Sequence, residues 1–434
     1  MSIIKQVYAK IIPLIKGNNR NFNTLIFLII VNMLLAAIGF ATRIKMANIL
    51  GSLNYGILSY SIAISSYIET ITRYGTDKTL IRDIVQQEHR MAEIVGITLL
   101  LKLILLFTCL IILSIYIKMY PNKGSDLVLW VIIGSSLISL EAKGVYDATN
   151  NIRRHSIYFA FYRIMFFVSI WSYILIFDSQ LTVKYVGISM TATACIYLAI
   201  QYGWIFSQYL KKIRIKTLIL GIWEWLARNF FLCFSALCGL GFTNFNQLIL
   251  KNYCGSEELG VYSAAWQFFW VGNIFIEQIS RIGQPIFARK LQMEDTTESG
   301  LFMFVVKYLA VMVMTVLPIA VPMIVFPEFI ISNFFSHEYA QSITPLRFIG
   351  LYILMLSCGI VFSQYVIISN KDKLYMYSVL VTGLLSMLIA WLFIPKYQAT
   401  GAAITLVVSH GSAIVLYGII TFYDILRKRH KFII

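Results

Sequence analysis

The sequence predicts an all-α membrane protein with about twelve transmembrane helices, arranged as two parallel six-helix lobes. Three observations support this prediction: a strongly apolar composition, apolar runs as long as a membrane span, and a short motif that recurs six spans later. Hydrophobic residues make up 59% of the 434 residues and charged residues only 13%, whereas about a quarter of a soluble domain is charged. Lipid has to cover such a surface, and we therefore expect a membrane protein and not a soluble enzyme.

Twelve apolar runs are long enough to cross a bilayer, which takes about 20 helical residues. The ninth run is the longest and carries Pro318, Pro322 and Pro327, which remove backbone donors and should kink the helix. The expected spans are 24–42, 50–72, 94–117, 127–147, 156–177, 183–206, 222–250, 258–280, 301–334, 346–369, 374–394 and 400–423.

The basic residues predict the orientation in the membrane, because Lys and Arg concentrate in alternate connections that include both termini. The positive-inside rule then places both termini in the cytoplasm, and we expect the protein in the inner (cytoplasmic) membrane. Residues 1–23 show no signal-peptide pattern and are expected to form an amphipathic segment on the cytoplasmic face. The expected divisions after it are a first lobe at 24–210, a basic cytoplasmic linker at 211–221, a second lobe at 222–424 and a basic cytoplasmic tail at 425–434.

The internal repeat predicts the two lobes. The sequence GSLNYGI at 51–57 returns as GSEELGV at 255–261, and ETITRYG at 69–75 returns as EQISRIG at 277–283. The two matches differ in offset by four residues, which is about one helical turn, so Glu and Arg keep nearly the same helix face. Since six spans separate the copies, both halves start on the same side and form parallel repeats that can rock against each other.

Other functional classes find little support in the sequence. The net charge of +16 could indicate nucleic acid, but the basic residues flank the apolar runs as topology determinants do. The six cysteines have neither CxxC spacing nor a cysteine-rich loop. No HExxH, P-loop, GxSxG or metal-spaced cluster is present, so we expect no catalytic residue, metal or other cofactor.

Ionisable side chains within the spans indicate a functional cavity, because each costs at least a few kcal/mol in hydrocarbon. They lean positive, and surplus arginine suits an anionic ligand, since guanidinium pairs bidentately with phosphate. An alternative is that the acid–base pairs spaced i, i+4 only neutralise themselves. The candidate binding or gating residues are Arg43, Arg73, Lys102, Arg163, Arg228, Arg281, Glu69, Glu141 and Glu277.

Four short motifs carry a resemblance over nearly the whole chain. They are Ile49-Leu50-Gly51 with Tyr55-Gly56, Gly255 with Gly260-Val261-Tyr262-Ser263-Ala264-Ala265, Phe334-Phe335-Ser336-His337-Glu338-Tyr339, and Ile394-Pro395-Lys396-Tyr397 followed by Gly401-Ala402-Ala403. With these motifs the sequence resembles the multidrug/oligosaccharidyl-lipid/polysaccharide exporter superfamily, and within it the Wzx-type O-antigen flippases.

This resemblance implies a V-shaped bundle around a cationic cavity that opens alternately to each side. The implied cargo is an oligosaccharide on undecaprenyl pyrophosphate, with the polyprenyl tail left in membrane lipid. Implied partners are a polysaccharide polymerase and a chain-length regulator, and proton or sodium coupling is an open expectation. The chain departs from the family in two places: Asn48 stands where relatives often have a basic residue, and Asn246-Gln247 stand where they often have an acid.

Two other functions remain as alternatives at this point: a cation-coupled multidrug exporter on the same architecture, and a membrane polysaccharide polymerase or ligase. For the flippase, Arg73→Ala and Arg281→Ala are each expected to impair export, with only partial rescue by lysine.

Overall fold

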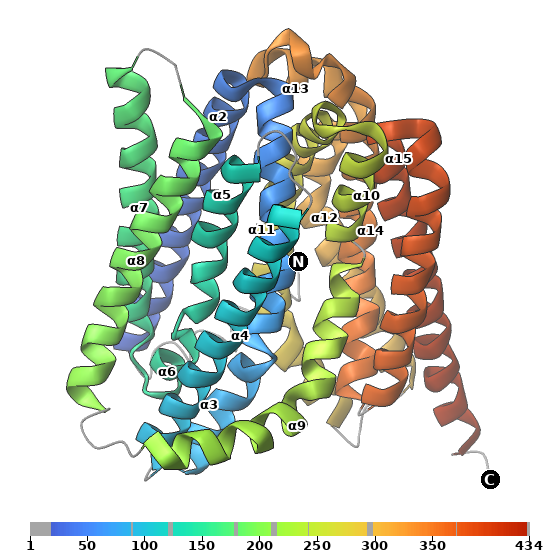
Figure 1. The fold of residues 1–434 in the computed structure, drawn as a ribbon. Helices are drawn as coiled ribbons and strands as arrows, with labels where there is room; N and C mark the ends of the chain where they lie inside the picture. The colour runs from blue at the N-terminus through green and yellow to red at the C-terminus, as the bar shows by residue number, and fades with distance from the viewer. Residues whose placement is uncertain are drawn as a thin grey trace.

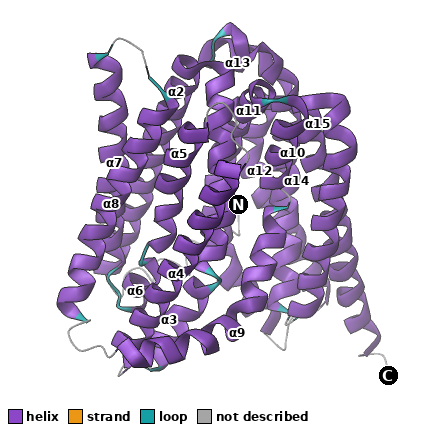
Figure 2. Cartoon of the chain, in the orientation of Figure 1, coloured by secondary structure: helices purple, strands orange, loops and turns teal. Residues whose placement is uncertain are grey.

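The computed structural model describes residues 19–431, apart from 88–89, 120–124, 178–180, 210–214, 242, 293–297 and 370. All regular structure in these ranges is helical (Figure 2). The long helices run side by side between two ends, which we call the upper and lower ends as drawn in Figure 1. The short helix α13 lies at the upper end, and α3, α6 and the end of α15 lie at the lower end.

The first half of the chain forms one bundle. Its elements are α2 (Asn19–Arg73), α3 (Thr76–Gln86), α4 (Met91–Met119), α5 (Ser125–Leu137), a 3-10 turn at Ile138–Leu140, α6 (Lys143–Ala148), α7 (Ile152–Ile176) and α8 (Val183–Gln208).

The second half repeats the pattern. Its elements are α9 (Ile215–Leu240), α10 (Asn244–Cys254), α11 (Ser256–Gln292), α12 (Glu298–Val325), α13 (Pro327–Phe334), a 3-10 turn called η3 (His337–Ser342), α14 (Ile343–Ile368) and α15 (Asp372–Lys431). In Figure 1 α10, α14 and α15 lie on the right-hand side and α7 and α8 on the left, whereas α9 begins beneath the first-half bundle.

Two of these helices each contain two predicted spans joined at a kink. In α2 the kink is at Gly51, whose φ of 71° and ψ of 168° are not helical. In α15 it is at Gln398, with a φ of 52°, three residues after Pro395. A positive φ costs glycine little, which explains why the repeated motif begins with glycine at this turn. The kinks therefore divide 24–42 from 50–72 and 374–394 from 400–423.

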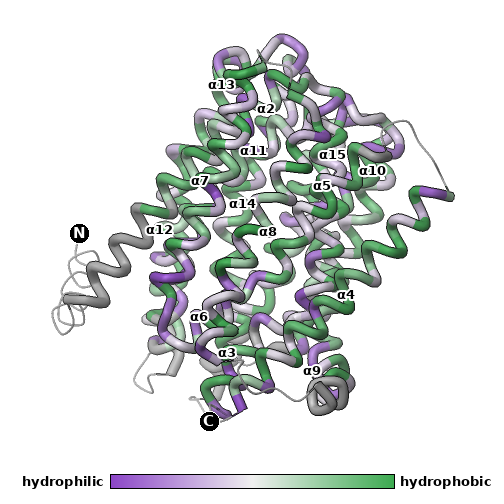
Figure 3. Tube along the Cα trace, turned by 60° about the vertical axis from the view of Figure 1, so that its left-hand side comes forward, coloured by the Kyte–Doolittle hydropathy of each residue, from purple (hydrophilic) through white to green (hydrophobic). Residues whose placement is uncertain are grey.

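The prediction of an all-helical protein with about twelve spans is confirmed. Eight described helical segments are long and apolar enough to cross a membrane, or nine if α9 and α10, bent by 48°, form one span. Two of the eight, α2 and α15, are kinked helices that each contain two predicted spans. Helix α11 has the length of a span but a more polar sequence. Hydrophobic residues predominate along the helices in Figure 3, as lipid contact requires.

The repeated motif forms the contact between the lobes at the upper end. A Cβ atom built at Gly56 of α2 would overlap the carbonyl oxygen of Ser256 in α11, and one built at Gly260 would overlap the carbonyl oxygen of Ser52. This reciprocity follows from the repeat, because each lobe supplies one Ser-x-x-x-Gly pair. Small residues at this spacing let two membrane helices approach until their backbones touch.

Helix α9 connects the lobes at the lower end, where it crosses beneath the first bundle (Figure 1). Trp225 packs into the apolar core that α3, α4 and α6 share. Arg228 pairs with Asp83 of α3, and the Thr79 hydroxyl donates to Asn229 Oδ1 at 2.9 Å. The start of the predicted second lobe thus packs against the first.

Candidate functional site

Two arginines of the first lobe lie close together at the lobe interface without a carboxylate partner. Arg43 comes from α2 and Arg163 from α7, and each is near enough to act on the other's charge. A Cβ built at Gly39, one turn before Arg43, would stand 3.5 Å from Arg163 Nη1. Neither arginine forms an ion pair with any residue that the structure describes.

Arg43 is surrounded by protein, yet its side chain remains accessible to solvent. Arg163 is half-buried and stacks on the Phe159 ring at 5.0 Å. Two unpaired guanidinium groups beside each other repel, and a doubly charged anion that bridges both would relieve that repulsion.

A cross-lobe hydrogen bond lies next to the Arg43–Arg163 pair. Tyr55 of α2 is buried and near enough to Arg43 to affect its charge. Gln267 of α11 donates from Nε2 to the Tyr55 hydroxyl at 2.6 Å. Above it the Gly56 and Gly260 backbones meet, so the arginines are closed off from the upper end by both lobes.

A second set of cross-lobe contacts, which we call the upper latch, comes from the segment after α13. Asn48 donates from Nδ2 to the Phe334 carbonyl at 2.8 Å and accepts from the Ser336 amide at 3.0 Å. Glu338 accepts from the Ser52 amide at 3.0 Å, and Tyr339 donates to the Ala47 carbonyl at 2.8 Å. The departure at Asn48 thereby gains an explanation, since a Lys or Arg there could not accept from the Ser336 amide.

Several acids and bases near the first lobe's lower end form a network around Glu141, which is buried where α5 gives way to α6. The Glu141 carboxylate accepts from the Tyr197 hydroxyl and contacts His155 Nε2, both at 2.8 Å. Gln201 donates to the same hydroxyl at 2.6 Å and accepts from the Ala142 amide. The non-helical backbone after Leu140 thus has polar partners inside the bundle, as it must at membrane depth.

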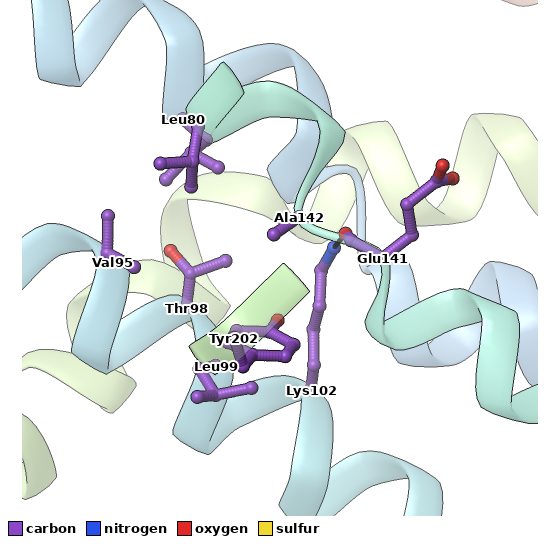
Figure 4. A pocket seen from close by; sticks show the side chains of 9 residues that line it. Leu80, Val95, Thr98, Leu99, Lys102, Glu141, Ala142 and Tyr202 are labelled. Atoms are coloured by element: carbon purple, nitrogen blue, oxygen red, sulfur yellow. Dashed lines mark hydrogen bonds between the residues drawn. The ribbon is translucent and has the colours of Figure 1, made fainter. Parts of the chain in front are cut away.

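Arg73 and Lys102 belong to this network, and both are paired. Arg73 lies 2.8 Å from Glu69, 2.7 Å from Asp77 and 3.6 Å from Glu141. Lys102 is buried, with Nζ 2.7 Å from Asp77 Oδ1. In Figure 4 its ammonium group points across a small pocket toward the backbone at Glu141, and Tyr202, Thr98 and Leu80 complete the wall. This pocket lies inside the first lobe and not between the lobes.

The i, i+4 spacing joins Glu69 to Arg73, Glu224 to Arg228 and Glu277 to Arg281. In the described structure an ion pair forms between Glu69 and Arg73, but Arg73 also pairs with Asp77 and Glu141 and so does not only neutralise its own helix. Arg228 instead pairs with Asp83 and stacks on Trp225 at 4.6 Å. Glu277 accepts from Asn273 at 2.8 Å, and Arg281 is exposed with no ion pair in the described chain.

Sequence reasoning missed several residues that the fold brings into these clusters. Asp77 had a usable signal, because it lies four residues after Arg73 and so on the same side if the chain stays near-helical. Asp83, His155, Tyr197 and Glu338 had none, because each meets its partner from a different helix.

Replacing the two copies of the repeated arginine should have different effects on stability. Arg73→Ala would leave Glu69, Asp77 and Glu141 without their shared cation and should cost about 2 to 3 kcal/mol, less than for a fully buried pair because Arg73 is partly exposed. Arg281→Ala removes no ion pair and should leave stability near that of the wild type. Melting temperatures in detergent check this, and equal losses in the two variants would contradict it.

Comparison with known proteins identifies the family of this chain. The family described as polysaccharide biosynthesis protein matches residues 23–290. The chain belongs to this family. Its relatives include the capsular polysaccharide biosynthesis protein CapF of Staphylococcus aureus, which is 22% identical over 282 residues that cover 63% of this chain and 68% of CapF.

Solved structures show the same fold for this family member. One is a multidrug resistance MATE family transporter of the MOP superfamily in an inward-facing conformation, with a TM-score of 0.72, 14% identity, and coverage of 91% of this chain and 95% of the other. Another is the lipid II flippase MurJ in an inward closed conformation, with a TM-score of 0.69, 12% identity, and coverage of 92% and 89%. The chain therefore has the fold of these MOP-type structures, and the resemblance drawn from its motifs is confirmed for the fold and for a polysaccharide biosynthesis family.

Proposed function

We propose that this chain is a flippase that moves oligosaccharide repeat units on undecaprenyl pyrophosphate from the cytoplasmic to the periplasmic leaflet, as in O-antigen or a related surface polysaccharide. The observation that carries the proposal is the Arg43–Arg163 pair, which lies at the lobe interface and has no carboxylate partner among the described residues. A pyrophosphate offers several oxygens to two guanidinium groups. The CapF relative, a capsular polysaccharide biosynthesis protein, supports a polysaccharide cargo.

The proposed path runs between the lobes while the lipid tail stays in the membrane. We assign the lower end to the cytoplasm, because the end of α15, which leads to the predicted cytoplasmic tail, lies there (Figure 1). The glycine contact and the upper latch close the periplasmic end in this state. Rocking the lobes about the kinked helices would break these contacts and expose the arginines to the other side.

We place cation coupling at the Glu141 network. Glu69, Asp77 and Glu141 contribute three negative charges, and Arg73 and Lys102 contribute two positive charges. A proton on His155, 2.8 Å from Glu141, would make the network neutral. Export that persists when both the proton and the sodium gradients are collapsed would remove this part of the proposal.

A deletion strain tests the proposed function. Without the gene, lipid-linked units should accumulate on the cytoplasmic leaflet and surface polysaccharide should be lost. Accumulation on the periplasmic leaflet would favour a polymerase or ligase, and altered drug sensitivity with normal polysaccharide would favour a drug exporter. The polymerase and the chain-length regulator stay predictions as partners.

A further inference from the structure

The repeat places two equivalent arginines near the lower end, and among the described residues Arg73 is neutralised within its own lobe whereas Arg281 is not. Arg281 lies 25 residues after Ser256, which starts α11 at the upper end. At about 1.5 Å per residue this is roughly 37 Å, more than the thickness of the hydrocarbon core, so Arg281 lies near the lower boundary. Its counterpart Arg73 has three carboxylates around it.

The two lobes differ because their chains continue differently after the repeated motif. In the first lobe α2 ends at Arg73, Tyr74 and Gly75 have positive φ, and α3 brings Asp77 back onto the guanidinium. In the second lobe α11 continues to Gln292, and Pro285 holds the place of Asp77. A proline carries no charge, so Arg281 has no acid at the position that Asp77 holds relative to Arg73.

An acid of the other lobe, Asp147, lies within electrostatic reach of Arg281. Asp147 of α6 is half-buried at the lower end, and the Arg281 charge acts on its carboxylate across the lobe interface. From its own lobe Asp147 also experiences the charges of Lys143, His155 and Glu141. Its carboxylate forms no ion pair with a residue in the described ranges.

We propose that Arg281 and Asp147 form the lower gate, and that Arg281 exchanges between Asp147 and an incoming phosphate headgroup. When the lower end closes, α11 and α6 approach and the guanidinium binds the Asp147 carboxylate. When it opens, the same guanidinium is free to bind a phosphate, which Arg can do in the same bidentate geometry. The two anions compete for one cation, so a headgroup at the entrance holds the gate open. The phosphate half of this exchange rests on the proposed function, and the ion pair does not.

The experiment measures closure of the lower end in the full-length protein in vesicles. Exposed Ser207 and Lys373, at the lower ends of α8 and α15, are replaced by cysteine and spin-labelled after the six native cysteines are changed to alanine. The short-distance fraction reports the closed gate. Arg281→Ala and Asp147→Asn should each at least halve this fraction, and the swap Arg281→Asp with Asp147→Arg should restore it. Unchanged single variants, or a swap no better than either, would overturn the gate.

Inorganic pyrophosphate tests the exchange. In the wild type, millimolar pyrophosphate should reduce the closed fraction, and Arg281→Lys should respond more weakly because lysine binds as a point charge. The same addition should not change Arg281→Ala. If the swap restores closure but pyrophosphate has no effect on the wild type, the ion pair stands and the exchange is overturned, independently of whether the protein flips lipid-linked sugars in the deletion assay.

Discussion

Gly56→Ala will hold the two lobes apart at the upper end and abolish export, and Gly260→Ala will do the same. The added methyl at Gly56 would overlap the Ser256 carbonyl, and the methyl at Gly260 would overlap the Ser52 carbonyl. Both obstacles are backbone, so no side-chain movement can make room. A penalty on the order of 5 kcal/mol in the closed state is enough to reverse a two-state equilibrium from 99:1 to 1:99.

The measurement is the distance between spin labels at Leu53 and Phe329, two exposed positions on opposite lobes at the upper end. Both glycine variants should shift to longer distances. Gly418→Ala is the matched control, since a Cβ there meets nothing within 4 Å and alanine favours helix there as at Gly56. Short distances and normal export in Gly56→Ala would show that the glycine contact is not a gate.

Arg43→Ala combined with Arg163→Ala will reduce export by at least about 100-fold. Each charge-assisted bond to a phosphate is worth about 1.5 to 3 kcal/mol, and the two arginines act on one headgroup. Stability should change little, because neither side chain has an ion pair to lose in the described structure. Lysine at both positions should recover part of the activity, since it keeps the charge but not the bidentate geometry.

Export is measured as surface polysaccharide in the deletion strain, at matched protein levels. Arg347→Ala is the control, because Arg347 lies near the upper end and pairs with exposed Glu328 at 3.6 Å. Near-normal export in the double variant would show that Arg43 and Arg163 do not bind the substrate during transport. Loss of export in Arg347→Ala as well would show that the effect of removing arginine is not specific to the pair.

The sequence predicted the architecture because membrane spans and repeats are properties of residue order. It located the Gly-Ser motif in both halves, but only the fold shows that the two copies touch each other. The prediction of ion pairs had a different limit. The i, i+4 spacing correctly indicated the Glu69–Arg73 contact, but it gave the same expectation for Glu277 and Arg281. The second lobe also has Pro285 at the position that Asp77 holds in the first. Contacts between distant helices, such as Glu338 with Ser52, leave no periodic signal.

The central claim is that a phosphate headgroup crosses the membrane between the lobes, past Arg43 and Arg163. The most direct measurement follows labelled undecaprenyl-pyrophosphate oligosaccharide in vesicles that contain this protein alone and reports the leaflet in which the label resides. The account predicts transfer between leaflets with the wild-type protein and no transfer above protein-free vesicles with the double alanine variant. No transfer by the wild type, or equal transfer by both proteins, would contradict it.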